Sequence, residues 1–424
     1  MKPYGYGLRW RQTGLNGIFA RPSSRRSLLR QIGLAGLSVA AAPAWSEEIV
    51  KLPLASDPRD RPLTNEFPQK HDVILQRDRP PLLETPMHVF DRGVFTPNDQ
   101  FYVRWHWAVI PNAVDANTFR LAVRGHVDKV LSLSLSDILH DYPRIELAAV
   151  NQCSGNSRGQ FMPRVPGAQW AHGAMGNARW TGVRLKDVLD RAGVKAGAVQ
   201  VRFNGLDEPV VPEAPDFMKS LDLDHARDGE VMIAFAMNGE QFPLLNGFPL
   251  RLIVPGWYST YWVKMLNDIE VLSKPDDNYW MTTAYTIPDT PYANITPGQT
   301  GVKMVPISRM VPRSFITNIT PGASLPAGAN TLARGIAFGG DTGVAKVEFS
   351  YDAGKSWQPA KLGTDQGKYS FRQWEANFTL PGRGDHSLMV RCTNSADVVQ
   401  PDVANWNTSG FMRNVVEAIP VTAT

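Results

Sequence analysis

Residues 147–182 read LAAVNQCSGNSRGQFMPRVPGAQWAHGAMGNARWTG. A strand-like run at 145–150 leads into Cys153, one of two cysteines in the chain. A turn of glycine, asparagine and serine with one arginine follows it. Backbone N–H groups and positive charge beside a thiol favour the thiolate, which is the form that reacts or binds a metal. The stretch therefore predicts a functional thiol, with a buried apolar cysteine or a disulfide to Cys392 as the alternative.

The same stretch contains a pattern known from hydrolases. Gly155-Asn156-Ser157-Arg158-Gly159 matches the G-x-S-x-G turn that carries a nucleophilic serine. That turn needs a helix after it, whereas residues 161–167 contain two prolines and a glycine, which are incompatible with a helix. His386 is the candidate base, and no acid is marked out. A serine hydrolase is therefore an alternative with little local support.

The first 44 residues have the pattern of an export signal. Arg25 and Arg26 precede an uncharged run at 31–44, which ends in the triplet Ala42-Pro43-Ala44. This order is typical of a twin-arginine signal peptide. The run is shorter than the roughly 20 apolar residues that a membrane-spanning helix needs. We therefore expect a periplasmic protein.

The charge balance changes once this segment is set aside. The chain carries 44 Lys and Arg against 40 Asp and Glu, a net charge of +4. Seven of the basic residues and none of the acidic ones lie in residues 1–44, which leaves 44 − 7 = 37 against 40, or −3. The remainder thus lacks the basic character of a nucleic-acid-binding protein.

Common cofactor motifs are missing from the sequence. It contains no C-x-x-C-H for attached haem, no H-E-x-x-H zinc motif, no Walker loop and no G-x-G-x-x-G. Its eight histidines show no zinc-type spacing. Any redox or metal chemistry must therefore use few protein ligands.

Amino-acid composition and the pattern of apolar residues divide the rest of the chain into three parts. Residues 45–98 are rich in proline, arginine and aspartate and predict an irregular N-terminal wrap. Residues 99–297 mix strand-like and helix-like pieces and predict an α+β domain with a mixed sheet. Residues 298–424 alternate strands with Gly/Pro turns and predict a β-sandwich. The expected strands are 119–127, 145–150, 199–203, 231–236, 250–254, 331–338, 345–351, 369–380 and 386–392, and the expected helices are 134–140 and 185–192.

Several spaced motifs occur in one order along the chain. They are Phe101-Tyr102-Val103-Arg104-Trp105-His106, Asn151-Gln152-Cys153-Ser154-Gly155-Asn156-Ser157-Arg158, Gly173-Ala174-Met175-Gly176-Asn177-Ala178-Arg179-Trp180, Asn246-Gly247-Phe248-Pro249-Leu250-Arg251 with Val254-Pro255-Gly256, and Trp280-Met281-Thr282-Thr283-Ala284-Tyr285. Together they resemble the sulfite oxidase family, in particular its exported bacterial sulfite dehydrogenases. The resemblance runs from around residue 66 to residue 424. It implies a sulfite-oxidase-type molybdopterin domain followed by an immunoglobulin-like sandwich that mediates dimerisation.

The resemblance also implies roles for individual residues. Cys153 would be the sole protein ligand of molybdenum, and soft thiolate suits a redox-active transition metal. Arg104 and Arg158 would bind the substrate oxyanion, for which the guanidinium fork is well suited. Tyr285 would donate a hydrogen bond near the metal, and His106 would orient the pocket. The implied cofactor contacts are Tyr102, Val103, Arg104, Trp105, His106, Asp207, Asn246, Arg251, Trp262, Val263 and Lys264.

One position departs from the family pattern. Asn246 stands where animal and plant members commonly have histidine, which puts that cofactor contact in doubt. Cys392 would be a buried thiol of the sandwich, because a disulfide to Cys153 would remove the metal ligand.

The activity implied is oxidation of sulfite to sulfate by oxygen-atom transfer at the cysteine-ligated molybdenum–pterin centre. Because no haem motif is present, the electrons are expected to pass to an external c-type cytochrome, which could be held as a subunit. Two alternatives keep the cofactor: oxidation of sulfane sulfur on a carrier protein, and reduction of an S- or N-oxide. A third is a cofactor-free extracellular binding protein with Cys153 in a disulfide.

Overall fold

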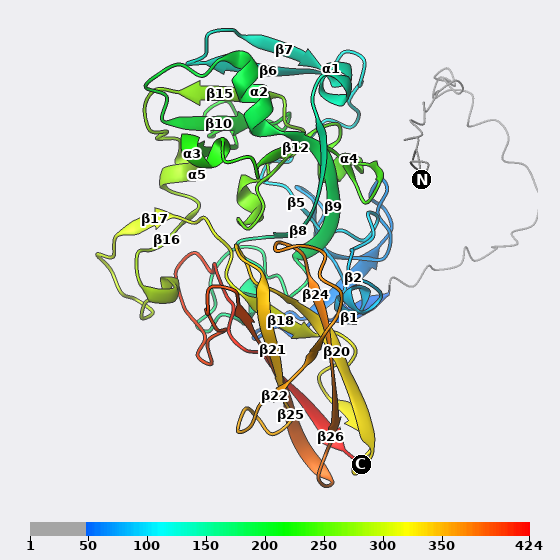
Figure 1. Ribbon diagram of the computed structural model, residues 1–424. Coiled ribbons are helices and arrows are strands. Elements are labelled where there is room, and N and C mark those ends of the chain that lie inside the picture. Colours follow the sequence, from blue (N-terminus) through cyan, green and yellow to red (C-terminus); the bar gives the residue numbers. More distant parts are fainter. Residues whose placement is uncertain (1–47) are drawn as a thin grey trace, which may run out of the picture. The chain divides into compact units, whose positions relative to one another are not determined.

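Two long antiparallel strands frame the cysteine loop in the computed structural model, which describes residues 48–424 (Figure 1). They are β8 (Arg144–Gln152) and β9 (Met175–Arg184), paired from Arg144 opposite Val183 to Gln152 opposite Met175. The expected strand at 145–150 is therefore confirmed and extended. The predicted export signal lies outside the described residues, so it stays a prediction.

Strand β9 was not among the expected strands. Its residues MGNARWTGVR are almost all buried, so they show no alternation of polar and apolar side chains. Its glycines are required by close packing: a Cβ at Gly176 would lie 2.6 Å from the Phe101 ring, and one at Gly182 would lie 2.1 Å from the Ile233 carbonyl oxygen. A strand buried on both faces and built around glycine carries little local signal.

The sheet that contains β8 and β9 has the order β13-β12-β9-β8. Strand β14 pairs with the first three residues of β12, Met232 to Ala234. The other members are β12 (Met232–Met237), β13 (Glu240–Gln241) and β14 (Arg251–Ile253), and short helix α4 (Leu244–Gly247) lies between the last two strands in sequence. The expected strands at 231–236 and 250–254 correspond to β12 and β14. This sheet brings the ends of β8 and β14 toward the same site, as described below.

A second sheet has the order β11-β10-β15-β6-β7. Its β15–β6 pair is parallel and its other pairs are antiparallel, which makes the domain a mixed-sheet α+β fold as predicted. The strands are β6 (Arg120–Gly125), β7 (Leu131–Ser134), β10 (Gln200–Asn204), β11 (Met218–Asp222) and β15 (Asp268–Leu272).

Both expected helices are present beside this sheet. Helix α1 (Leu135–His140) begins with a capping box in which Ser134 and Asp137 satisfy each other's backbone N–H groups. Helix α2 (Leu185–Ala192) buries residues at positions i, i+3, i+4 and i+7 and ends at Gly193, whose φ is +70°. Shorter helices are α3 (Leu223–Ala226) and α5 (Tyr279–Thr282), and single 3₁₀ turns are η1 (Met87–Asp91), η2 (Arg158–Gln160), η3 (Ser259–Tyr261) and η4 (Pro291–Ala293).

The N-terminal segment is not irregular, contrary to the prediction. It forms four short strands that continue into β5, in the order β1-β2-β3-β4-β5. Each strand has only two to five residues, and two of them contain or adjoin a proline, so the strands are too short to show the alternation of polar and apolar residues that marks a strand. The strands are β1 (Ile49–Lys51), β2 (Asp60–Thr64), β3 (Val73–Arg77), β4 (Leu82–Glu84) and β5 (Val103–Arg104).

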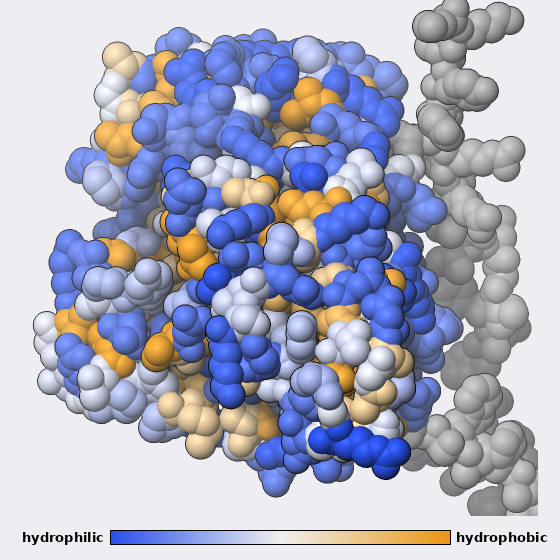
Figure 2. Space-filling model, turned by 60° about the horizontal axis from the view of Figure 1, so that its bottom comes forward, coloured by the Kyte–Doolittle hydropathy of each residue, from blue (hydrophilic) through white to orange (hydrophobic). Residues whose placement is uncertain are grey.

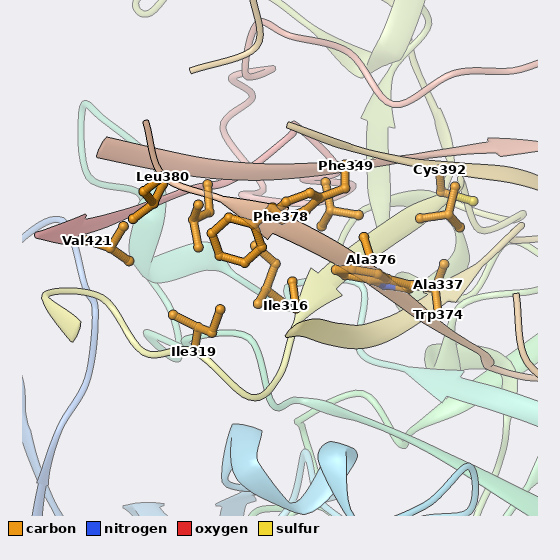
Figure 3. Packing of buried hydrophobic residues seen from close by; sticks show 14 of the residues in the cluster. Ile316, Ile319, Ala337, Phe349, Trp374, Ala376, Phe378, Leu380, Cys392 and Val421 are labelled. Atoms are coloured by element: carbon orange, nitrogen blue, oxygen red, sulfur yellow. The ribbon is translucent and has the colours of Figure 1, made fainter. Parts of the chain in front are cut away.

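The C-terminal part is a β-sandwich, as predicted. One sheet has the order β18-β20-β24-β23 and the other β19-β26-β25-β21-β22. Side chains from both sheets form one core that includes Trp374, Phe378, Phe349 and Cys392 (Figure 3). Both cysteines are free thiols, so the disulfide alternative is not borne out in the structure.

The strands of the sandwich follow the expected ranges closely at 331–338, 345–351 and 386–392, and the expected strand at 369–380 begins three residues later, at residue 372, and ends at residue 379. They are β18 (Arg313–Ile316), β19 (Ala323–Leu325), β20 (Asn330–Phe338), β21 (Val344–Ser350), β22 (Gln358–Pro359), β23 (Lys361–Leu362), β24 (Arg372–Thr379), β25 (Gly384–Asn394) and β26 (Ala418–Ala423). On the face of the molecule in Figure 2, apolar residues form small separate groups among hydrophilic ones, as on most protein surfaces.

The two predicted domains pack into one unit, Ile49–Thr424. Strand β16 (Thr286–Pro288) pairs with β17 (Met304–Pro306) across the expected boundary at residue 297. Residues 401–417 leave the sandwich and return to the cysteine loop, where the backbone N–H of Met412 donates to the Ser154 carbonyl (3.1 Å). No helix among residues 48–424 is long and apolar enough to cross a membrane.

Candidate functional site

Cys153 lies directly after strand β8, in a turn that is tied down on both sides. Its backbone N–H donates to the Ala174 carbonyl (2.9 Å), and its own carbonyl accepts from Asn156 N–H (3.0 Å). The Asn156 side chain completes the turn: it accepts from Ala174 N–H (3.0 Å) and donates to the His172 carbonyl (3.0 Å). The thiol is thus held by backbone geometry, with only 5% of the residue exposed.

Cys153 opens into a pocket that gathers most of the predicted site residues. The pocket is lined by Tyr102, Val103, Arg104, His106, Cys153, Ser154, Phe217, Leu245, Asn246, Arg251, Ser259, Thr260, Trp262, Lys264 and Tyr285. These residues come from several separate parts of the chain. The sequence motifs, which lie far apart along the chain, therefore converge on one place.

Positive charge predominates in this pocket. Burial, together with neighbouring Arg251 and Arg104, lowers the pKa of Lys264 to about 7, while Asp207 opposes them. Burial likewise lowers the pKa of Arg251 to about 10. Burial raises the pKa of Asp207, the acid beside Lys264, to about 6. Among residues 48–424, no carboxylate lies within ion-pair distance of Arg104, Arg251 or Lys264. Buried positive charges without a paired carboxylate favour the binding of an anion.

Several polar atoms around the pocket have no hydrogen-bond partner within the described residues. They are Arg104 Nη1, Ser154 Oγ, Asn246 Oδ1, Arg251 Nε and Thr260 Oγ1. Buried polar groups are nearly always paired, so such a group of orphans in one cavity indicates a polar occupant. Ser154 Oγ, Arg251 Nε and Thr260 Oγ1 are donors that would suit the phosphate and pterin of a molybdenum cofactor, and Cys153 would be its protein ligand. Among residues 48–424 there is no cluster of three or more His, Cys, Asp or Glu side chains able to hold a metal.

Backbone and side-chain contacts explain how the cofactor-binding candidates are held. The Arg251 guanidinium donates to the Asn246 carbonyl (3.1 Å) and to Asn151 Oδ1 (3.3 Å), which also accepts from the Tyr102 phenol (2.6 Å). The Lys264 ammonium lies 4.3 Å from the centroid of the Trp105 ring. Asn246, where histidine is common in the family, still faces the pocket.

Three of the predicted residues are close to the pocket without lining it. Trp105 is buried and donates from its indole to the Leu245 carbonyl (3.0 Å). Val263 lies between two lining residues, and its carbonyl accepts from Leu252 N–H (2.9 Å). Asp207 is also buried, beside Lys264. These residues support the wall of the pocket.

Tyr285 and His106 form a pair at the pocket wall. The phenol oxygen lies 2.5 Å from His106 Nε2. Burial holds the pKa of His106 well below its ordinary value, and Arg104, Lys264 and Lys219 lower it further. Burial also raises the pKa of Tyr285. Both groups are therefore neutral near pH 7, and they share a single hydrogen bond in which either the phenol or the imidazole N–H donates.

Arg158, which is predicted to bind the substrate oxyanion, lies beside the pocket, and that role stays a prediction. It does not line the pocket, and its guanidinium donates to the carbonyls of Ser409 (3.1 Å) and Ala168 (3.4 Å). Glycines make room for it: a Cβ at Gly155 or Gly410 would lie 2.5 or 2.8 Å from the side chain. The positive charge of Arg158 still acts on the site. Burial lowers the pKa of the Arg158 guanidinium, and Cys153 and Tyr285 are close enough for their charges to oppose this shift. Its Nε has no partner within the described part of the chain.

Phe411 is a site residue that sequence reasoning missed. Its ring stacks on Tyr285 with centroids 5.4 Å apart and an interplanar angle of 3°, and the Arg158 guanidinium carbon lies 5.1 Å from the same centroid. The residue comes from the C-terminal part, far from any motif, so the local sequence gives no signal. Phe411 itself lies behind Tyr285, and the pocket-lining residues that sequence reasoning missed are Phe217, Leu245, Ser154, Ser259 and Thr260.

These contacts make Phe411 a positioning residue. We expect Phe411→Leu to raise the KM for substrate by roughly three- to tenfold, because aromatic and cation–π contacts contribute about 0.5–1.5 kcal/mol each. Phe371→Leu is the matched control, since Phe371 packs in the same core and its ring contacts are with Phe90 and Phe338. Phe411→Tyr should restore KM. Equal KM changes in the two leucine variants would show that the effect is one of stability alone.

The hydrolase alternative fails on the structure. The predicted base, His386, lies in the sandwich and interacts with the Gly382 carbonyl (2.8 Å). Ser157 instead contacts His172, with Oγ 2.7 Å from Nδ1, and accepts from Arg313 Nη2 (3.0 Å). Ser157 is fully buried, so no substrate reaches it. Only one 3₁₀ turn follows, as expected from the prolines. This serine joins the cysteine loop to the C-terminal part.

Two domain families match this chain. Residues 107–280 match the oxidoreductase molybdopterin binding domain, and residues 305–423 match the Mo-co oxidoreductase dimerisation domain. The first match contains Cys153 and most of the pocket. It gives the pocket its cofactor, the molybdenum–molybdopterin group.

Mitochondrial sulfite oxidase of Homo sapiens is 32% identical over 373 residues, which are 84% of this chain and 66% of that protein. Mitochondrial sulfite oxidase of Rattus norvegicus is 32% identical over 382 residues, which are 85% of this chain and 67% of that protein. The chain thus spans 66–67% of the length of these relatives. The crystal structure of the sulfane dehydrogenase SoxCD from Paracoccus pantotrophus shares the fold, with a TM-score of 0.70, 22% identity, and coverage of 91% of this chain and 92% of that one.

Proposed function

Because this chain belongs to the sulfite oxidase family, we propose that it oxidises sulfite to sulfate at a molybdenum–molybdopterin centre ligated by Cys153. The observation that carries the proposal is the pocket in which the buried cysteine shares a cavity with Arg104, whose Nη1 has no partner among the described residues. A cationic pocket with a free guanidinium donor suits a small oxyanion better than a neutral substrate. We further propose that the protein acts in the periplasm and passes its electrons to a c-type cytochrome.

The chain's residues have separable roles in this reaction. The bound cofactor supplies oxygen-atom transfer and accepts two electrons, so that SO₃²⁻ + H₂O gives SO₄²⁻ + 2H⁺ + 2e⁻. Arg104 binds the sulfite oxygens, while Arg158 adds positive field from behind the pocket wall. The Tyr285 phenol and His106 Nε2 share one hydrogen-bonding proton at the pocket wall, where the pair can exchange a proton with the site. Phe217 and Leu245 cover the pocket wall and exclude water.

The proposal is tested by steady-state sulfite oxidation with ferricyanide or a c-type cytochrome as acceptor, alongside molybdenum analysis. We expect one molybdenum per chain and sulfite-dependent reduction of both acceptors. A molybdenum-loaded protein that is inert to sulfite would contradict the substrate assignment. It would direct the assays to sulfane-sulfur compounds and to S- or N-oxides.

The domain match at residues 305–423 supports a second proposal, that two copies associate through the C-terminal part. Analytical ultracentrifugation of the purified protein tests it. A monomer at micromolar concentration would overturn it.

Cofactor binding should depend on pH through Lys264. In the cofactor-free protein the pKa of this lysine is about 7, so below pH 7 it already carries its charge. Above pH 7 an anionic phosphate can bind beside a charged Lys264 only if the lysine takes up a proton. Affinity for molybdopterin should therefore fall as pH rises above 7, by at most about tenfold per pH unit.

Fluorescence titration of the cofactor-free protein with molybdopterin between pH 6 and 9 measures this dependence. The Lys264→Met protein should bind molybdopterin more weakly than the wild type at pH 6. Its affinity should change little between pH 7 and 9, where that of the wild type falls. If the affinity of this variant fell with pH as steeply as that of the wild type, a group other than Lys264 would be responsible for the pH dependence.

A further inference from the structure

Three loops next to the pocket share an unusual composition. Residues 107–115, 207–216 and 275–284 contain seven acidic residues and no lysine or arginine. Four of these acids, Asp115, Glu208, Glu213 and Asp277, are exposed. The other three are Asp216, which is half-buried, Asp207, which is buried, and Asp276, whose side chain is buried beside Arg202. Such a one-sided distribution stands out in a chain whose charges are otherwise nearly balanced. It indicates a surface of negative potential.

Backbone and ring contacts show that these loops are neighbours. Glu208 N–H donates to the Val109 carbonyl (3.0 Å), which ties the second loop to the first. The Trp280 indole donates to the Pro215 carbonyl (3.0 Å), which ties the third loop to the second. Trp107 and Trp280 meet edge to face, with centroids 6.0 Å apart. We call the three loops together the acidic face.

The acidic face also exposes large apolar side chains. Val210 is 56% exposed, Val211 50%, Tyr279 46% and Val109 40%. Apolar side chains surrounded by charges of one sign are the usual composition of a transient protein-docking surface. Because the surrounding charges are negative, the partner that fits is a basic one.

A chain of aromatic rings connects this face with the pocket. His106 and Tyr285, both pocket-lining, lie 4.8 and 6.2 Å from Trp280 between ring centroids. Trp280 in turn lies 5.3 Å from Tyr279, which is exposed. Electron transfer through protein becomes exponentially slower with distance. A surface joined to the pocket by two ring contacts is therefore a favourable exit for electrons.

We propose that the acidic face docks a basic haem protein that accepts the electrons, with Tyr279 at the contact and Trp280 behind it. This inference rests on the proposed function, because it takes the electrons to come from sulfite oxidation. Each turnover releases two electrons, and each haem iron takes one as Fe(III) becomes Fe(II). Two acceptor molecules, or two visits by one, are thus consumed per sulfite.

Charge reversal tests the docking face by binding alone. The probe is commercial cytochrome c, a basic haem protein, titrated by surface plasmon resonance. We expect Glu208→Lys/Glu213→Lys to raise Kd on the order of tenfold at low ionic strength, with the difference shrinking as salt screens the charges. The control is Glu66→Lys/Asp402→Lys, which makes the same charge change at exposed sites elsewhere in the chain. If Kd for cytochrome c rose equally in both double variants, the change in net charge alone would explain the weaker binding, and the docking face would be overturned.

Tyr279→Ala tests the electron exit. We expect the rate of cytochrome c reduction to fall several-fold while sulfite-dependent ferricyanide reduction is unchanged, and Tyr279→Phe to behave like wild type. Tyr292→Ala, which removes another exposed tyrosine outside the face, is the control. Unchanged cytochrome c reduction in Tyr279→Ala would overturn the exit. If sulfite reduces neither acceptor even in the wild type, the proposed function fails, while the binding comparison still decides whether the face docks a basic protein.

Discussion

The Cys153→Ser protein is expected to lose sulfite oxidation and to retain little molybdenum. A serine hydroxyl is a poor ligand for a soft metal site and is protonated near pH 7, whereas a metal-bound thiol is deprotonated. Removal of a residue that hydrogen-bonds to a metal ligand typically lowers metal affinity or activity 10–100-fold. Loss of the ligand itself should exceed that range. Molybdenum per chain and kcat for sulfite are the two measurements.

The fold should survive this change. Serine is close to cysteine in size, and the loop is held by backbone bonds and by Asn156, which do not involve sulfur. The matched control is Cys392→Ser, the other buried cysteine, in the core of the sandwich. There a hydroxyl replaces an apolar thiol, so we expect a loss of about 1–3 kcal/mol in stability with kcat little changed. A Cys153→Ser protein with normal sulfite turnover would contradict the assignment of the metal ligand.

Much of the fold could be predicted because several elements carry strong local signals. Helix α2 has apolar residues at helical spacing and a terminal glycine, and the sandwich strands are separated by regular turns. Strand β9 could not be found in the same way, since its glycines are explained only by Phe101 and Ile233, which come from other segments. The N-terminal strands were not predicted, because each is stabilised by pairing with a neighbouring strand and has too few residues to show alternating polar and apolar side chains.

The candidate site shows a similar division. The motifs placed Cys153, Arg104, His106 and Tyr285 together, and the structure brings them into one pocket or its wall. The roles assigned to them stay predictions, as does the export route. The position of Arg158 behind the wall could not be inferred, because it depends on carbonyls and glycines of distant segments. The contribution of Phe411 arises from the return of residues 401–417 to the cysteine loop, a tertiary contact without a local sequence signal.

Arg104→Ala is expected to have the second-largest effect and to act on substrate binding. The residue lines the pocket and its Nη1 lacks a partner among the described residues, so the guanidinium is free to bind an oxyanion. A hydrogen bond to a charged group contributes about 1.5–3 kcal/mol, which corresponds to roughly a 10- to 150-fold increase in KM for sulfite. Molybdenum content should stay near that of the wild type, because Cys153 is unchanged.

Arg104→Lys separates charge from geometry at this position. Lysine keeps the positive charge but cannot donate two parallel hydrogen bonds, so KM should lie between those of the wild type and the alanine variant. Arg158→Lys is the informative comparison, because its guanidinium already donates to the Ser409 and Ala168 carbonyls. We expect that change to lower kcat or stability more than it raises KM. If Arg104→Ala leaves KM unaltered while Arg158→Lys raises it, the two arginines have exchanged roles, and Arg158 must turn toward the pocket when sulfite binds.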